Sequence, residues 1–343
     1  MHRSLFATAI LPLSLLSVFT IPLTAQNSLS AYVQDAVTGF SGNTVPLGCA
    51  SSGLFAEGRS QILIPAAYLA GPNAVLNALA CVGNNSSAGN VTLTYASLKI
   101  TVSRTSATSL GATFANNLPL PQVVLNATNL TIPWVAGTWT SIPFTTGYLH
   151  DGTSNLVIEI QKVVSPLGDA TMRTIQNAGR SDLPRMINAL GGVGSGAHLA
   201  AVATVTSNWP LSMELRWNGL AGTTVPTVRL KSNNGGAANN QFAIGTMVEH
   251  TVQGAPGALF VNLQSLGLLS PPRLLPPVVG QQWVDGVTVN LGLLPASGLH
   301  TTFWALPANS ALVGLYSAFQ SVVAPAPFAQ LAFTNVADCI VRS

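Results

Sequence analysis

Charged side chains are scarce in this sequence. Only 7% of its 343 residues are Asp, Glu, Lys or Arg, whereas an average soluble protein has about 25%. The 13 basic and 10 acidic residues leave a formal net charge of +3, spread along the whole chain. So dilute a charge does not create the basic surface that gathers nucleic acids or anionic lipids. The composition therefore predicts no nucleic-acid partner.

Cysteine is also scarce, with Cys49, Cys81 and Cys339 as its three occurrences. None lies in a C-x-x-C or Cys/His pattern with zinc-ligand spacing, so we expect no metal site, and no motif indicates a cofactor. An odd number of cysteines in an oxidising compartment indicates one disulfide bond and one buried thiol. We favour Cys49 with Cys81 because both lie near the N-terminal end; three buried thiols are the alternative.

Long apolar runs are confined to the N-terminus, where residues 1–25 have the features of a secretory signal peptide. A short basic start, His2 and Arg3, precedes the apolar stretch, and the small Ala25 stands before the polar Gln26. Two prolines interrupt the stretch, which favours cleavage near Ala25 over an uncleaved membrane anchor. No later segment has 18 uninterrupted apolar residues. We expect a secreted, extracellular mature chain without a membrane span; retention in the periplasm or at the cell surface is the alternative.

Apolar and polar residues alternate along much of the remaining chain. In residues 155–161 and 211–217 every second side chain is apolar, and residues 91–102 follow a similar pattern. A period of two is typical of half-buried antiparallel strands. Residues 65–70 and 74–81 are weak helical candidates, although the β-rich surroundings are equally compatible with strands.

Turn-forming residues recur every 8–15 positions or so, as an all-β sandwich or jelly roll requires. We therefore predict an all-β fold of two antiparallel β-sandwich or jelly-roll-like domains, residues 26–222 and 223–343. The boundary falls in the segment 219–226, which contains glycine and proline. The second domain is expected to contain seven strands, near residues 227–231, 242–249, 258–263, 287–293, 300–306, 314–323 and 331–341.

Several strings resemble a pattern found in uncharacterised secreted β-rich bacterial proteins. Residues 139–148, Trp-Thr-Ser-Ile-Pro-Phe-Thr-Thr-Gly-Tyr, and residues 155–160, Asn-Leu-Val-Ile-Glu-Ile, are similar to the family's IPFTTPFxY and NLVIEI strands. Gly147 departs from the pattern. Residues 113–117 resemble an earlier strand of that family, and residues 254–260, 306–309 and 312–319 resemble an accompanying C-terminal β domain. The resemblance implies secretion and a β-rich fold, and it supplies no functional site.

Candidate catalytic residues are few. Glu159 and Glu214 both occupy polar positions of predicted strands and could meet across a sheet as the paired carboxylates of a glycosidase. Ser195 lies in the glycine-rich segment 192–196 near His198, but it lacks the strand-turn-helix context of a nucleophile elbow. Solvated strand positions and a flexible loop are the favoured interpretations. His150, His198, His250 and His300 lack sequence partners, which favours isolated positions at turns and strand ends.

Two further segments carry weaker signals. Residues 151–155, Asp-Gly-Thr-Ser-Asn, begin like a calcium loop but lack the later acidic ligand unless Glu159 turns inward, so a tight turn is favoured. Trp134 and Trp139 flank a predicted turn and are speculative carbohydrate-binding residues, since an exposed indole can stack on a sugar ring. Trp217 lies in the apolar phase of its strand and is expected in the core.

These features predict a secreted, non-enzymatic β protein that serves as an extracellular structural, surface or matrix component. One alternative is a carbohydrate-binding module that uses Trp134 and Trp139 to bind polysaccharide or cell-surface components. Another is a secreted hydrolase with Glu159, Glu214 or a Ser/His set. Self-association through exposed strand edges is a further prediction of the structural role.

Overall fold

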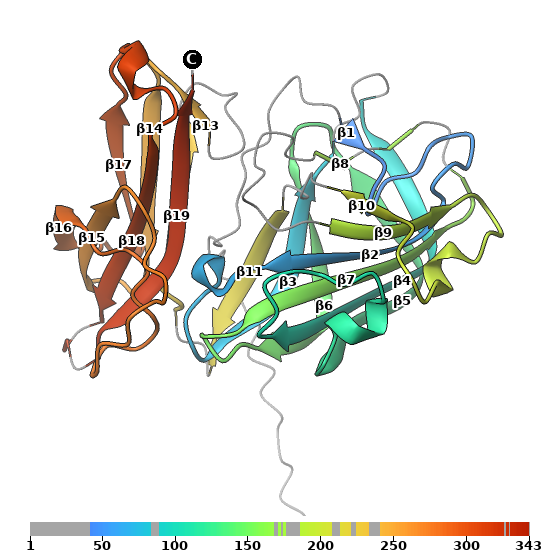
Figure 1. Ribbon diagram of the computed structural model, residues 1–343, viewed down its shortest axis with the longest axis horizontal. Helices are drawn as coiled ribbons and strands as arrows, with labels where there is room; N and C mark the ends of the chain where they lie inside the picture. Colours follow the sequence, from blue (N-terminus) through green and yellow to red (C-terminus); the bar gives the residue numbers. More distant parts are fainter. Residues whose placement is uncertain are drawn as a thin grey trace, which may run out of the picture.

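The chain folds into β-strands, as its alternating pattern predicts (Figure 1). The structure is a computed structural model that describes residues 42–83, 89–167, 171–172, 174–175, 186–207, 213–220, 224–232, 241–325, 327–328 and 330–342. The signal peptide predicted at residues 1–25 lies outside these ranges. Within them, no helix is long and apolar enough to cross a membrane, and helical structure is limited to single 3-10 turns such as η1 (Ala66–Tyr68), η2 (Phe114–Asn117), η3 (Ala197–Leu199) and η5 (Ser310–Leu312).

The N-terminal strands form three antiparallel sheets. The largest has six strands in the order β10-β9-β2-β7-β4-β5, a second has the order β11-β3-β6, and a third pairs β1 with β8. The strands are β1 (Gly42–Asn43), β2 (Glu57–Ile64), β3 (Ala74–Val82), β4 (Val91–Thr105), β5 (Pro121–Trp134), β6 (Trp139–Leu149), β7 (Asn155–Val164), β8 (Thr174–Ile175), β9 (Met186–Gly191), β10 (Val205–Ser207) and β11 (Met213–Gly219).

The two weak helical candidates have different outcomes. Residues 74–81 form β3, which pairs with β11 on one side and with β6 on the other. A strand in the middle of a sheet satisfies its backbone on both edges, and this tertiary pairing outweighs weak local helix preference. Residues 65–70 contain only the 3-10 turn η1, which begins directly after Pro65.

One face of the six-stranded sheet differs from the sequence prediction. Leu156, Ile158 and Ile160 of β7 pack into the main core, as predicted. Glu159, on the opposite face, is also buried, with 3% of its surface exposed. Gln61 beside it donates to the carbonyl of Phe114 in η2, and Gln161 donates to the carbonyl of His198 in η3. Since these short turns cover the polar face, it is a buried polar layer and not a solvated surface.

The C-terminal strands form two more sheets, with the orders β13-β19-β18-β15-β16 and β12-β14-β17. A turn that includes Gly245 divides the predicted strand at 242–249 in two, and the other predicted strands appear with small shifts at their ends. Phe260 and Phe319 from the first sheet pack against Val248 and Val252 from the second. The strands are β12 (Thr227–Ser232), β13 (Gln241–Ala243), β14 (Met247–Gln253), β15 (Leu259–Ser265), β16 (Val287–Leu293), β17 (Leu299–Ala305), β18 (Tyr316–Ala324) and β19 (Ala332–Arg342).

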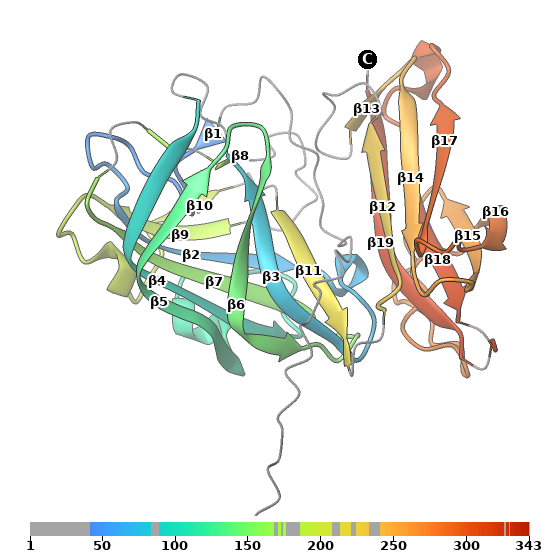
Figure 2. The ribbon, with the colours of Figure 1, turned by 180° about the vertical axis from the view of Figure 1, so that it is seen from behind.

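The two groups of strands lie side by side (Figure 2). Among the described residues no strand of one group pairs with a strand of the other, while the predicted boundary at residues 222 and 223 lies outside the described ranges. Side chains nevertheless join the groups: the buried carboxylate of Asp338 in β19 accepts hydrogen bonds from Tyr68 of η1 at 2.8 Å and from Tyr316 of β18 at 2.9 Å. Ala318 and Val336 belong to the same apolar cluster as the N-terminal core.

Candidate functional site

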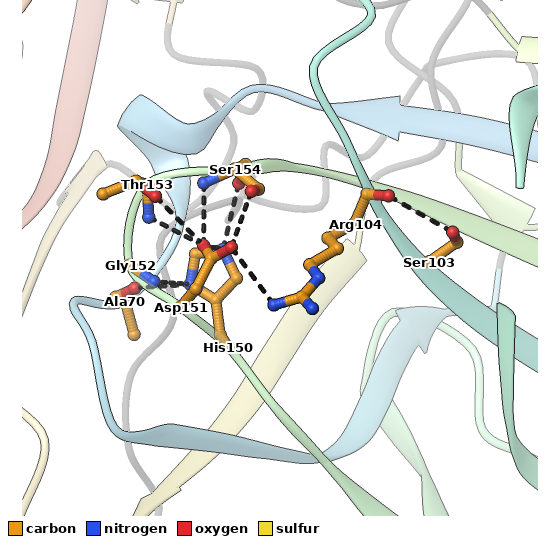
Figure 3. Close-up of polar contacts among 8 residues, drawn as sticks. All are labelled: Ala70, Ser103, Arg104, His150, Asp151, Gly152, Thr153 and Ser154. Carbon is orange, nitrogen blue, oxygen red and sulfur yellow. Dashed lines mark hydrogen bonds and ion pairs between the residues drawn. The ribbon is translucent and has the colours of Figure 1, made fainter. Parts of the chain in front are cut away.

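The segment predicted as a calcium loop or tight turn joins β6 to β7 (Figure 3). One oxygen of the Asp151 carboxylate accepts hydrogen bonds from the backbone N–H groups of Thr153 at 2.9 Å and Ser154 at 2.8 Å. The other accepts from the Ser154 hydroxyl at 2.6 Å and lies 3.7 Å from a guanidinium nitrogen of Arg104. Burial opposes ionisation, but these hydrogen bonds outweigh it and hold the pKa of Asp151 well below its usual range. The carboxylate therefore serves the turn itself, as the tight-turn interpretation expects.

His150 ties this turn to the neighbouring chain. Its buried ring places Nδ1 3.0 Å from the carbonyl oxygen of Ala70 and Nε2 3.0 Å from that of Ser154. The ring also packs against Trp217, with centroids 5.7 Å apart. Within the described part of the chain, no three His, Cys, Asp or Glu side chains are grouped in a way that could hold a metal ion. The surroundings of His150 are those of a structural histidine.

Replacing Asp151 with asparagine is expected to lower the free energy of unfolding by about 1–2 kcal/mol at pH 7. The single asparagine oxygen can accept only the two backbone hydrogen bonds, without charge, and the amide nitrogen cannot accept the bond from the Ser154 hydroxyl. The folded-state pKa of Asp151 lies below the unfolded value of about 3.9. Its contribution is therefore present above about pH 4 and is lost as the pH falls further. Urea unfolding between pH 2 and pH 7 should show the two proteins converging in acid. A constant difference across this range would contradict the prediction.

The second cluster surrounds Glu57, the first residue of β2. Its carboxylate accepts hydrogen bonds from the backbone N–H groups of Gly194 and Gly196, both at 2.7 Å, and lies 3.0 Å from Nδ1 of His198. The Ser195 hydroxyl donates to the same oxygen as His198, at 3.5 Å. Burial raises the pKa of Glu57, but the hydrogen bonds from His198 and the two glycines lower it by more, so the pKa lies below its usual value. The glycine-rich segment is thus fastened to the sheet through one carboxylate.

This geometry does not match a serine hydrolase. In such an enzyme the serine hydroxyl donates to one ring nitrogen of the histidine while the carboxylate holds the other. Here the Ser195 hydroxyl and Nδ1 of His198 both contact the same oxygen of the Glu57 carboxylate, so the hydroxyl is directed to the carboxylate and not to the histidine. The structure brings the Ser/His set together, but as an anchor for a loop. Sequence reasoning missed Glu57 because 137 or more residues separate it from its partners.

Glu159 and Glu214 lie in different sheets and do not meet as a catalytic pair, but the favoured interpretation of two solvated positions is also wrong, because both side chains are buried. Glu159 of β7 binds Nε of Arg59 at 2.8 Å and the side-chain amide of Gln61 at 2.7 Å. Glu214 of β11 binds Nε of Arg216 at 3.2 Å. Each carboxylate is buried and paired with its own arginine, an arrangement that stabilises the sheets and offers no shared cleft for a glycosidic bond.

The predicted surface pair of tryptophans is not formed either. Trp134, at the end of β5, is fully buried in the main core. Trp139, at the start of β6, is half-buried. Trp134 belongs to the apolar phase of β5 with Ile132, and this phase places its ring inside. Trp217 is buried, as predicted.

The cysteines are three buried free thiols, so the favoured bridge between Cys49 and Cys81 is absent. The Cys49 thiol donates to the carbonyl of Ala50 at 3.2 Å, whereas Cys81 is enclosed in β3. Burial raises the pKa of both thiols well above the usual range, and the nearby Lys162 partly opposes this effect at Cys49. The alternative of three buried thiols describes the structure.

Lys162 is a buried charge that the sequence analysis overlooked. It occupies the core-facing phase of β7, with 1% of its surface exposed. Its Nζ donates to the carbonyl of Thr44 at 3.1 Å and to that of Gly48. Burial lowers its pKa to about 7, against an attractive effect of Cys49. The sequence did indicate this burial, because Lys162 continues the alternating row of Ile158 and Ile160 that faces the core.

The C-terminal sheets hold a buried histidine of a different kind. His250 of β14 stacks on Trp304 at a centroid distance of 5.1 Å and lies 5.6 Å from the ring of Phe319. Burial, with a smaller effect of His300, lowers the pKa of His250 to about 3. The ring is therefore neutral at ordinary pH and contributes to the core between the two sheets.

An apolar surface lies at the edge of the same part of the chain. Val287, Val289, Leu291 and Leu293 project from β16 with exposed fractions of 69%, 36%, 65% and 61%. β16 pairs with β15 along one side, and along its other side no strand of the described ranges pairs with it. We call these four side chains, together with the free backbone edge of β16, the β16 edge. The β16 edge combines a strand edge whose backbone pairs with no described strand and an apolar surface, and both features favour association.

Comparison with known proteins gives little further guidance. No protein-family model matches the sequence, and no curated protein is similar to it. Among solved structures, a red sea bream transglutaminase aligns with 10% sequence identity and a TM-score of 0.18, over 90% of this chain and 32% of the transglutaminase chain. The chain thus spans about a third of that protein's length, and a similarity at this level carries no argument about fold or activity.

Proposed function

We propose that the protein is a secreted, non-enzymatic structural component of an extracellular surface or matrix. The observation that carries this proposal is the β16 edge, an uncharged apolar strand edge on a rigid β scaffold. Exposed apolar patches on soluble proteins are typical of interaction surfaces. Together with the predicted leader sequence, a surface suited to contacts supports a structural role outside the cell.

The uses of the carboxylates support the same proposal. Asp151 holds a turn, Glu57 fastens the glycine-rich segment, and Glu159 joins β2 to β7 through Arg59 and Gln61. Charge-assisted hydrogen bonds of this kind are stronger than neutral ones. The few charged groups of the chain therefore rigidify loops on the sheets, which suits a durable scaffold.

Export is the experiment that tests this function. The full-length chain, produced in a bacterial secretion host, should lose residues 1–25 and appear in the medium or on the cell surface, with a mature N-terminus near Gln26 by mass spectrometry. A variant with both Leu15→Arg and Leu16→Arg, which interrupts the apolar stretch of the leader, should remain inside at full length. Retention of the unaltered chain in the cytoplasm, uncleaved, would overturn the proposal.

The carbohydrate-binding alternative now rests on Trp139 alone, because the ring of Trp134 is enclosed. A saturable signal on a glycan array that Trp139→Ala abolishes in a folded protein would favour that alternative over the structural role.

A further inference from the structure

The β16 edge has only one of the devices that normally protect a strand edge, a register shift in its ladder with β15 between Thr288 and Asn290. Natural proteins guard exposed edges with lysine, proline, bulges or very short strands. The seven residues of β16, Val-Thr-Val-Asn-Leu-Gly-Leu, contain neither a charge nor a proline. The charged residue nearest to β16 in the sequence is Asp285, whose carboxylate is 2.7 Å from a guanidinium nitrogen of Arg273 and so is already paired. By contrast, the edge strand β10 has only three residues.

In β16 the side chains of residues 290–293 alternate between the two faces of the sheet, and the register shift in the ladder with β15 lies just before them. Asn290 points between the sheets and donates to Thr302 of β17 at 3.0 Å, while Gly292 lies against the ring of Phe260. Leu291 and Leu293 project from the other face, opposite Val261 and Leu259 of β15 in the ladder. The inner face is therefore committed to the C-terminal core, and the outer face and the backbone edge are available to a partner.

We infer that β16 pairs antiparallel with β16 of a second copy of this chain, which joins two five-stranded sheets into one continuous sheet. Two identical strands in antiparallel orientation are related by a two-fold axis, so each contact is made twice and the assembly closes as a dimer. Strand addition of this type gains its affinity from backbone hydrogen bonds and its specificity from alternating side chains. The inference deepens the proposed structural role and rests on it for its biological meaning.

The lack of charge on β16 favours a second copy over a charged partner. Two copies that meet at β16 present no like charges to each other along the strand, and the net charge of the whole chain is only +3. Long-range repulsion, which keeps many proteins monomeric, is correspondingly small. A basic or acidic partner would find no complementary charge on this strand.

The size of the contact sets the expected affinity. A seven-residue strand and its exposed side chains bury less than the standard interface of about 1,600 Å². We therefore expect a weak dimer with a Kd on the order of micromolar. Pairing of β16 with β17 of the next copy would instead be heterologous and would produce open chains of increasing length.

Sedimentation velocity of purified residues 26–343, from about 1 to about 300 µM, tests the inference. The expected result is a shift from monomer to dimer with no larger species. Leu291→Lys places a charge at an exposed position of β16 and should raise the dimer Kd at least about tenfold. The matched control is Val205→Lys in β10, which is also exposed, at 48%, and also on an edge strand; it should leave the Kd unchanged.

Three outcomes would overturn the inference: a monomer at every concentration, equal effects of the two lysine variants, or growth beyond the dimer. Circular dichroism of each variant confirms that it is folded. Because purified protein is used, a monomer that is nevertheless exported would remove the β16 pairing and leave the proposed function standing. A dimer that is not exported would do the reverse.

Discussion

Trp134→Ala is expected to lower the free energy of unfolding by about 3–5 kcal/mol, the usual loss for a fully buried aromatic side chain. The indole lies in the main core with no exposed surface. Its removal leaves a cavity in the main core beside Val91, the residue opposite it in the β4–β5 ladder. Equilibrium unfolding in urea measures the loss directly.

Trp139→Ala is the matched control for this prediction. Its ring is half-buried at the start of β6, so we expect a loss of about 1–2 kcal/mol, since less apolar area is returned to water. Equal and small losses in the two variants would show that Trp134 is not a core residue. A glycan signal that disappears in Trp134→Ala must be read together with this result, because unfolding alone would abolish it.

Lys162→Met is expected to remove the contribution of this lysine to the pH dependence of the free energy of unfolding. In the folded state the pKa of Lys162 is lowered from 10.5 to about 7. Between these values the unfolded chain binds a proton that the folded chain does not, so stability rises with pH across this window. From pH 7 to pH 10 the contribution of Lys162 to the free energy of unfolding increases by up to about 4 kcal/mol, since one pKa unit corresponds to about 1.4 kcal/mol.

Urea unfolding at several pH values between 7 and 10 tests this prediction. The free energy of unfolding of the natural protein should rise with pH relative to that of Lys162→Met, because methionine is neutral throughout. The buried thiols Cys49 and Cys81 have the opposite effect on the slope in both proteins, and it cancels in this difference. The control is Lys99→Met in β4, a lysine that is partly exposed, and it should preserve the slope. A Lys162→Met variant that keeps the full slope would show that another group causes it.

The strands were largely predictable because their signal is local. The alternation in residues 155–161 identifies the core-facing row of β7, and residues 287–293 coincide with β16. β3 was ambiguous because its neighbours in the sheet, β11 and β6, come from distant parts of the sequence. Pairing partners of this kind decide between strand and helix, and they are not encoded in the segment itself.

The polar clusters were less predictable for a related reason. The Asp151 turn is local, and its interpretation as a tight turn follows from five consecutive residues. The Glu57 cluster joins β2 to a loop 137 or more residues away, so only the fold reveals it. Likewise, alternation places Glu159 on a polar face but does not show that η2 and η3 cover that face.

The β16 edge lay between these two cases. The strand at residues 287–293 was predicted, but an apolar row of this kind is a core face wherever a second layer covers it. The fold leaves these side chains exposed and places β16 at the end of its sheet. The tryptophan pair failed in the opposite way, because the turn between Trp134 and Trp139 was correctly located while the phase of β5 directed Trp134 inward.

Hydrogen–deuterium exchange of β16 at low and high protein concentration tests the central claim most directly. If two copies pair through this strand, the amides of Val287–Leu293 that face away from β15 should exchange more slowly at about 300 µM than at about 1 µM. The amides of β10 should exchange at the same rate in both samples. Identical exchange of β16 at the two concentrations would contradict the account of this protein as a self-associating β scaffold.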